Sequence, residues 1–126
     1  MKPRELTLST GAKIFLGKNS ENNDELVSNF KGKQNVILHT AEPGSPFCII
    51  EKTNPSKDEI YEAGIFCASK SQDWRDNKHD IKLHIFTGHD VKKSLWMKSG
   101  SWKLRNEPKE IIIKKKDILG ASKSKN

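Results

Sequence analysis

The stretch from Asn35 to Glu51 (NVILHTAEPGSPFCIIE) most constrains what this chain can fold into. Its two apolar runs flank a polar Pro-Gly-Ser segment, a pattern typical of two strands joined by a short loop. Gly44 allows the positive φ angle that a tight turn after proline often needs. His39 ends the first strand and Ser45 follows the turn, where exposed backbone N–H groups could grip a phosphate or a base edge. An ordinary hairpin containing a hydrogen-bonded histidine also explains the pattern.

The rest of the chain alternates between short strands and helices. Periodicity predicts the following elements: a hairpin over 5–9 and 11–17, a helix of about ten residues capped by Ser20, a helix over 57–71, a half-buried strand over 80–87, a turn or short helix over 88–93, and a last strand over 110–116. Ser56 and Glu59 form the sequence pattern of a capping box at the start of the second helix. Residues 72–77 are expected to form a polar connection, in which Arg75 could reach a phosphate, although Asp73 and Asp76 favour local ion pairing.

The charge is unevenly distributed. Residues 1–77 contain ten basic and eleven acidic side chains, whereas residues 78–126 contain thirteen basic and five acidic ones, so the net charge of +7 arises from the second part. This asymmetry indicates a polyanionic partner, most simply nucleic acid, although a solubilising basic tail would give the same balance. Residues 94–105 interleave Trp96 and Trp102 with basic residues, as an RNA surface does, although both tryptophans could instead belong to the core.

Motifs for catalysis or metal binding are weak in this sequence. It has no Walker loop, no dinucleotide-binding fingerprint and no Cys-x-x-Cys pair. A hydrolase could only be assembled from His39 with Ser45, or from Cys67 with a histidine, and we expect neither. Two lone cysteines, no apolar h-region and no apolar run of membrane-spanning length favour a cytoplasmic protein without a cofactor, a metal or a membrane partner.

Several segments together resemble the NFACT-R family, the RNA-binding domain of large ribosome-associated quality-control factors, which also occurs as small stand-alone proteins. The matching residues are Gly17-Lys18-Asn19, Asn23-Asp24-Glu25-Leu26, Leu38-His39-Thr40, Pro43-Gly44-Ser45, Glu62-Ala63, Ala68-Ser69, Thr87, Val91-Lys92-Lys93 and Gly100. Their order and spacing hold over residues 8–116. Lys18 replaces the family's usual arginine, and Pro46 stands where histidine often follows Gly-Ser. The resemblance implies contact with tRNA or ribosomal RNA, and possible association with the ribosome, but not the tailing of peptidyl-tRNA.

We therefore expect a single α+β domain over 1–116, with a mostly antiparallel or mixed sheet and two main helices on one face, followed by a flexible basic tail over 117–126. The expected function is RNA binding without catalysis; the alternative is a module that docks through its acidic helices on a ribosomal or tRNA-handling protein. The expected RNA-binding residues are Lys18, Asn19, Asn23, His39 and Ser45, forming a polar pocket for a nucleotide or a tRNA end, Lys92, Lys93, Lys98, Lys103 and Arg105, holding phosphates, and Thr87 from the family match.

Overall fold

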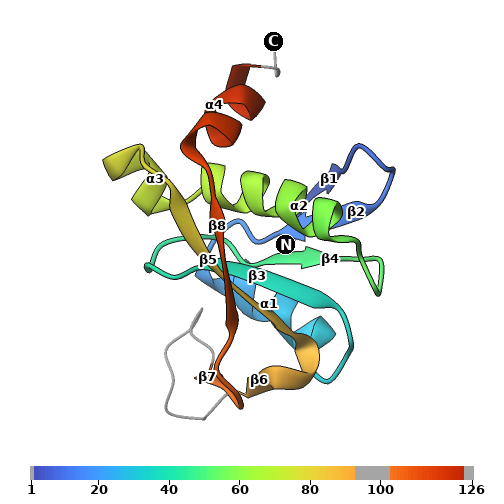
Figure 1. The fold of residues 1–126 in the computed structure, drawn as a ribbon. Helices are drawn as coiled ribbons and strands as arrows, with labels where there is room; N and C mark the ends of the chain where they lie inside the picture. Colours follow the sequence, from blue (N-terminus) through green and yellow to red (C-terminus); the bar gives the residue numbers. More distant parts are fainter. Residues whose placement is uncertain (1, 93–102, 124–126) are drawn as a thin grey trace.

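The structure, a computed structural model, describes residues 2–92 and 103–123. Six strands form one sheet in the order β1-β2-β4-β3-β5-β8, and every pairing in it is antiparallel. The strands are β1 (Arg4–Thr7), β2 (Lys13–Leu16), β3 (Val36–Thr40), β4 (Cys48–Ile50), β5 (Ile81–Thr87) and β8 (Lys109–Ile113). The helices are α1 (Ser20–Phe30), α2 (Lys57–Ser69), α3 (Gln72–Asn77) and α4 (Lys115–Lys123). Figure 1 shows their arrangement around the sheet. The α+β class expected from the sequence is confirmed.

Both predicted hairpins are present. Strand β3 pairs with β4 around the Pro-Gly-Ser turn, and β1 pairs with β2 around Gly11. Gly44 has a φ of +91°, as the turn requires, and a side chain there would also meet Cβ of Gln72 at 2.9 Å. The hairpin turn therefore packs closely against the start of α3.

The two main helices cover opposite faces of the sheet, so the expectation that both lie on one face is wrong. Leu38, Cys48 and Ile50 belong to the cluster that packs under α2, whereas Ile37 and Ile49 belong to the cluster that packs against α1. All five side chains are fully buried. Strands covered on both faces are apolar at consecutive positions instead of alternate ones. The uninterrupted runs in β3 and β4 were therefore the signal for a three-layer arrangement.

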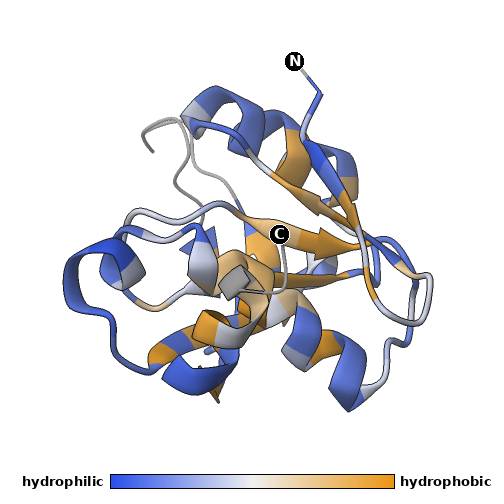
Figure 2. Ribbon diagram, turned by 90° about the horizontal axis from the view of Figure 1, so that it is seen from above, coloured by the Kyte–Doolittle hydropathy of each residue, from blue (hydrophilic) through white to orange (hydrophobic). Residues whose placement is uncertain are grey.

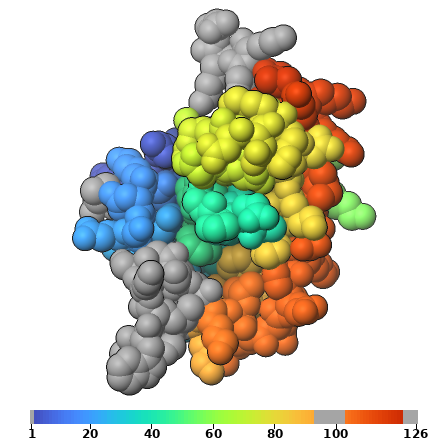
Figure 3. Space-filling view, turned by 90° about the vertical axis from the view of Figure 1, so that its left-hand side faces the viewer, coloured from blue at the N-terminus to red at the C-terminus, as the bar shows by residue number. Residues whose placement is uncertain are grey.

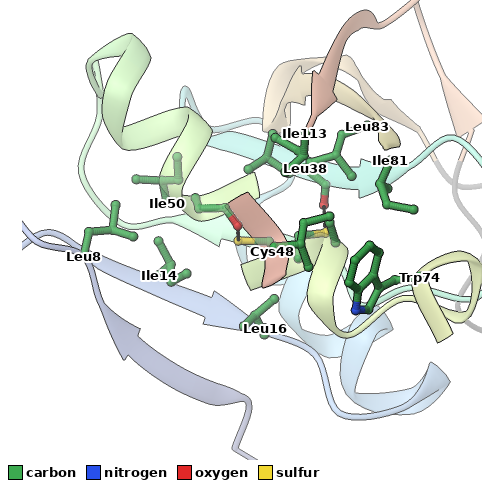
Figure 4. Close-up of a cluster of buried hydrophobic side chains, with 14 residues drawn as sticks. Leu8, Ile14, Leu16, Leu38, Cys48, Ile50, Trp74, Ile81, Leu83 and Ile113 are labelled. Carbon is green, nitrogen blue, oxygen red and sulfur yellow. Dashed lines mark hydrogen bonds between the residues drawn. The ribbon is translucent and has the colours of Figure 1, made fainter. Parts of the chain in front are cut away.

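The larger hydrophobic cluster lies between the sheet and α2 (Figure 4). It joins residues from β2, β3, β4, β5 and β8 to Trp74 of α3. Hydrophobic residues are concentrated in the strands, whereas the surrounding loops are mostly hydrophilic (Figure 2). Small residues on α2, namely Ala63, Gly64, Cys67 and Ala68, let this helix lie close to the sheet. A Cβ at Gly64 would lie 2.7 Å from Cδ1 of Ile113.

Local hydrogen bonds fix where the helices begin. The capping box of α2 is confirmed: the Ser56 hydroxyl accepts a hydrogen bond from the Glu59 N–H, and the Glu59 carboxylate accepts one from the Ser56 N–H. Helix α1 is capped by Asn19 and not by Ser20, since the Asn19 side chain accepts from the N–H of Asn22 at 2.9 Å. Asparagine is as good an N-cap as serine, so the cap lies one residue before the expected position.

Residues 72–77 form a helix instead of the expected polar connection. The Ser71 hydroxyl caps it by accepting from the Trp74 N–H at 3.1 Å. Trp74 is only 4% exposed and packs in the larger cluster, which anchors this short helix.

The expectation of a flexible tail from residue 117 is also wrong for the residues that the structure describes. Residues 115–123 form α4, and Ile118 is fully buried in the larger cluster. The Tyr61 hydroxyl donates to the Asp117 carboxylate at 2.5 Å and accepts from the Lys114 N–H at 3.0 Å. Thus α4 is attached to α2 by both apolar and polar contacts. Strand β8 ends at Ile113, whereas the strand predicted from the sequence continued through the basic residues 114–116.

A two-stranded ribbon extends from the end of β5. After a 3-10 turn (Gly88–Asp90), β6 (Val91–Lys92) pairs with β7 (Lys103–Leu104), and Lys92 lies directly opposite Lys103. Within 2–92 and 103–123, none of the helices has the length and apolarity needed to cross a lipid bilayer.

Candidate nucleic-acid interface

The loop between β2 and α1 is built by three asparagine side chains. Asn19 caps the helix, the side-chain oxygen of Asn22 accepts from the Lys18 N–H at 3.0 Å, and that of Asn23 accepts from the Phe47 N–H at 3.1 Å. Asn22 and Asn23 are 1% and 8% exposed. The asparagines therefore hold the loop in shape and tie it to the start of β4.

Gly17 is required by the same arrangement. A Cβ on Gly17 would lie 1.8 Å from the side-chain oxygen of Asn23 and 2.7 Å from its Cγ, although the φ angle of Gly17 is an ordinary one. The Gly17 N–H also donates to the Phe47 carbonyl at 3.1 Å. Gly17 and Asn23 thus pack closely against each other, and Lys18 is exposed in the loop between Gly17 and the start of α1.

Three separate parts of the chain meet around this loop and enclose a pocket of about 360 Å³. It is lined by Arg4, Gly17, Lys18, Asn19, Ser20, Asn23, Gly44, Ser45, Pro46, Lys70 and Arg75, and we call it the basic pocket. Figure 3 shows residues near 20 (blue), the turn that contains Gly44 (teal) and the segment around α3 (yellow) side by side on one face. The structure thus brings together four predicted residues, Lys18, Asn19, Asn23 and Ser45.

The basic pocket has a strongly positive lining. Arg4, Lys18, Lys70 and Arg75 are its charged residues, and no aspartate or glutamate lines it. Its wall also includes Asn19 and Ser20, at the start of α1, where backbone N–H groups and the helix dipole favour an anion. The pocket therefore has the chemistry of a phosphate-binding site.

Arg75 is placed by its neighbours and not by an ion pair. Its guanidinium donates to the Lys70 carbonyl at 3.1 Å and to the side-chain oxygen of Gln72 at 2.9 Å. The anticipated pairing with Asp73 or Asp76 is not formed, because Asp73 accepts from Asn77 and His79, and Asp76 accepts from Gln72. From the sequence, Arg75 could either contact a phosphate or form a local ion pair, and Arg4 and Lys70 were not predicted as site residues. No local pattern marks either residue, because the three cations converge only when β1, α2 and α3 are packed.

His39 and Ser45 belong to the same hairpin, and each makes hydrogen bonds to the backbone there. Nδ1 of His39 lies 2.8 Å from the Thr40 carbonyl, and its ring packs on Phe47 with centroids 4.5 Å apart. Burial lowers the pKa of His39, which favours the neutral ring. The Ser45 hydroxyl accepts from the Thr40 N–H at 3.1 Å and donates to the Pro46 carbonyl at 3.1 Å. His39 does not line the basic pocket, whereas Ser45 does.

Neither of the hydrolase pairings considered from the sequence is assembled. The Ser45 hydroxyl donates to a backbone carbonyl, so it does not face a general base. Cys67 is fully buried, and burial raises the pKa of its thiol to about 12. Among the residues that the structure describes, no three histidine, cysteine, aspartate or glutamate side chains are grouped as a metal ion would need.

Four of the other predicted residues that the structure describes lie at or beyond the end of β5 that is opposite α3: Thr87 is the last residue of β5, Lys92 and Lys103 belong to the ribbon, and Arg105 follows β7. Figure 1 shows the ribbon at this end of β5. The Thr87 hydroxyl and N–H both contact the Asp90 carboxylate, at 3.3 and 3.1 Å, so Thr87 shapes the turn into the ribbon. Lys92 and Lys103 face each other across the ribbon, and the Arg105 N–H donates to the Asp90 carbonyl at 2.8 Å. Lys93, Lys98, Trp96 and Trp102 lie outside the described residues.

An apolar groove of about 710 Å³ lies between α2 and the strands β5 and β8. Val36, Ile60, Ile85 and Ile111 are among the residues that line it, and Lys57, Asp90, Glu107 and Lys109 add charges of both signs. A mostly apolar lining with charges of both signs is not what an anion-binding site needs. The basic pocket is therefore the stronger candidate for contact with nucleic acid.

Two known proteins illustrate what this chain is similar to. The archaeal Rqc2 homolog aRqcH of Methanocaldococcus jannaschii is 22% identical over 107 residues, which cover 80% of this chain but 16% of that protein. A solved structure of the C-terminal part of the fibronectin/fibrinogen-binding protein from Streptococcus suis superposes with a TM-score of 0.81 at 20% identity, over 95% of this chain and 49% of that one. The chain thus spans only a minor part of the curated relative and about half of the structural one. The family described as the NFACT protein RNA binding domain matches residues 2–106, and this chain belongs to that family.

Proposed function

We propose that this domain binds RNA without catalysing a reaction, and that it does so on ribosomal RNA or tRNA in a setting related to ribosome quality control. The observation that carries the proposal is the basic pocket, in which the Lys18 loop of the family motif meets basic residues from three other elements with no acidic residue in the lining. The family description and the name of the archaeal relative support the same function. This setting would place the protein in the cytoplasm.

The ribbon supplies a second basic surface. Like charges directly opposite each other on paired strands are destabilising, and Lys92 and Lys103 form such a pair with both side chains exposed. A phosphate placed between them would relieve this repulsion. Since β5 has seven residues, the ribbon begins about 20 Å from the α3 end of that strand, at about 3.3 Å per residue. One RNA strand of several nucleotides would therefore be needed to contact both surfaces.

The test is the salt dependence of RNA affinity. Binding of a labelled tRNA and of a single-stranded RNA is measured by fluorescence anisotropy between 50 and 200 mM salt, for the unaltered chain and for the double variants Lys18→Gln/Arg75→Gln and Lys92→Gln/Lys103→Gln. Each double variant should bind more weakly, and the slope of log K against log salt should fall by roughly one for each phosphate contact removed. Lys31→Gln is the matched control for the pocket variant, because Lys31 is an exposed cation just beyond the other end of α1.

The alternative of docking on a protein partner gives a different result. Unchanged affinity and an unchanged slope in both double variants would refute the assigned surfaces. Recovery of ribosomal or tRNA-handling proteins with this domain after nuclease treatment, together with absence of RNA binding, would favour the docking function instead.

A further inference from the structure

The two basic surfaces differ in shape, and this difference bears on which phosphate each one suits. On the ribbon, Lys92 and Lys103 lie on two short paired strands. In the basic pocket, Arg4 comes from β1, Lys18 from the loop before α1, Lys70 from the end of α2 and Arg75 from α3, and all four line a single concavity of about 360 Å³. Charges spread over a surface suit a backbone that runs across it, whereas charges gathered around one concavity suit a compact anion.

Three of the four cations in the pocket are not compensated by an acidic side chain within the part of the chain that the structure describes. Among the described residues, Arg4, Lys18 and Arg75 form no ion pair with an acidic side chain. Arg75 uses N–H groups of its guanidinium to reach the Lys70 carbonyl and Gln72, and these bonds fix the plane of the group. A guanidinium has five N–H donors, so further donors remain for a ligand. Such a fixed, incompletely used guanidinium suits two-point recognition of a phosphate.

The position of Arg75 is itself set by the hairpin turn. The Gln72 N–H donates to the Gly44 carbonyl at 2.8 Å, and Gly44 leaves no room for a side chain beside Gln72. The turn therefore fixes the start of α3 relative to the Lys18 loop, to which β4 is tied through Phe47 and Asn23. The pocket is thus a preformed part of the fold.

An internal phosphodiester carries one negative charge, and two of its oxygens are bonded to the chain. A phosphate monoester carries about −1.5 to −2 at pH 7 and offers three free oxygens. We propose that the basic pocket binds the terminal phosphate group of an RNA chain, at its 5′ or 3′ end, while the ribbon contacts internal phosphates. This inference rests on the proposed RNA-binding function and extends it by naming the group that the pocket recognises.

The test compares RNAs that differ only at their ends. A single-stranded 12-mer is prepared in two labelled sets: one labelled at the 3′ end with either 5′-phosphate or 5′-hydroxyl, and one labelled at the 5′ end with either 3′-phosphate or 3′-hydroxyl. At pH 7.5, one of the two phosphorylated ends should raise affinity by about tenfold, the effect expected for one added charge-assisted contact. The set that shows the increase identifies which end is bound.

Measurements on variants and at lower pH test whether the preference for a phosphorylated end arises in the basic pocket. Arg75→Gln and, separately, Lys18→Gln should abolish the preference for the phosphorylated end, whereas Lys31→Gln should retain it. Both pocket side chains are exposed, and circular dichroism verifies that the variants fold. The preference should also shrink between pH 7.5 and 5.5, because a monoester takes up its second proton near pH 6 and a diester does not.

The outcomes separate this inference from the proposed function. Equal affinity for phosphorylated and hydroxyl ends would overturn the inference and leave RNA binding intact. Absence of binding to every 12-mer and to tRNA would overturn both. A phosphoserine peptide that binds more tightly than any RNA, and loses affinity in Arg75→Gln, would assign the pocket to a phosphorylated protein and overturn the RNA-end assignment.

Discussion

Replacing Gly17 with alanine tests whether the family motif at the start of α1 is architectural. The added methyl group would lie 1.8 Å from the Asn23 side-chain oxygen, so the carboxamide must rotate away. That oxygen accepts the Phe47 N–H at 3.1 Å, and Asn23 and Phe47 are only 8% and 5% exposed. Rotation would therefore leave a buried backbone donor without its partner.

The expected loss of stability follows from that one hydrogen bond. A buried donor left unsatisfied costs about 1–3 kcal/mol, so Gly17→Ala should lower the free energy of unfolding by about 2 kcal/mol. For a chain of this length, the melting temperature should fall by roughly 6–10 °C. Backbone strain adds little, because the φ angle of Gly17 lies outside the positive range.

Urea unfolding followed by circular dichroism measures this effect, and a double-mutant cycle isolates its cause. Asn23→Ala alone should also cost about 1–3 kcal/mol, since it removes the same acceptor. In Gly17→Ala/Asn23→Ala no carboxamide remains to be displaced, so the second change should add almost nothing to the first. Additive losses in the cycle, or a Gly17→Ala variant as stable as the unaltered chain, would refute this account of the Gly17–Asn23 pair.

Three further results are expected elsewhere in the domain. Ile118→Ala should cost about 2–4 kcal/mol in urea unfolding, because Ile118 is fully buried; a cost near zero would restore the flexible tail. Hydrogen bonds from Thr10, Ser56 and Lys52 lower the pKa of Glu59 from its usual value to about 2, so its stabilising effect is present above about pH 4.5 and lost as the pH falls towards 2. Acid should therefore reduce stability across that range less in Glu59→Gln than in the unaltered chain, and equal losses would contradict the assignment. The Cys67 thiol should react with a thiol reagent at pH 8 only after unfolding, since burial raises its pKa to about 12; fast labelling of the folded protein would contradict this burial.

The local sequence pattern was sufficient to predict most strands and helices, but it did not predict which face of the sheet each helix covers. The β3–β4 hairpin, the capping box at Ser56 and the alternating strand β5 each depend on residues close together in the sequence. The placement of α1 and α2 on opposite faces depends on which helix covers which side of the central strands. That information was present in the consecutive apolar residues of β3 and β4, whose burial on both faces requires two covering layers.

Helices α3 and α4 were missed because their stability comes from distant contacts. Six residues of polar sequence do not form a stable helix alone, and α3 depends on Trp74 entering the core. The α4 sequence contains only Ile118 and Leu119 as large apolar residues, and one of them, Ile118, supplies the buried anchor. Tyr61 adds a polar contact to this helix from 56 residues away.

The basic pocket shows why a motif can locate a site without identifying the residues that act in it. The side-chain oxygens of Asn22 and Asn23 accept hydrogen bonds from backbone N–H groups of the protein, and Gly17 leaves room for the Asn23 side chain. These three residues therefore fix the shape of the loop. The charge comes from Lys18 of the motif and from Arg4, Lys70 and Arg75, which no motif includes. Changing Asn23 would therefore weaken binding chiefly through stability, whereas changing Arg75 would weaken it in a stably folded protein. Affinities corrected for the folded fraction can separate these two effects, and only the second kind of residue should alter the salt slope.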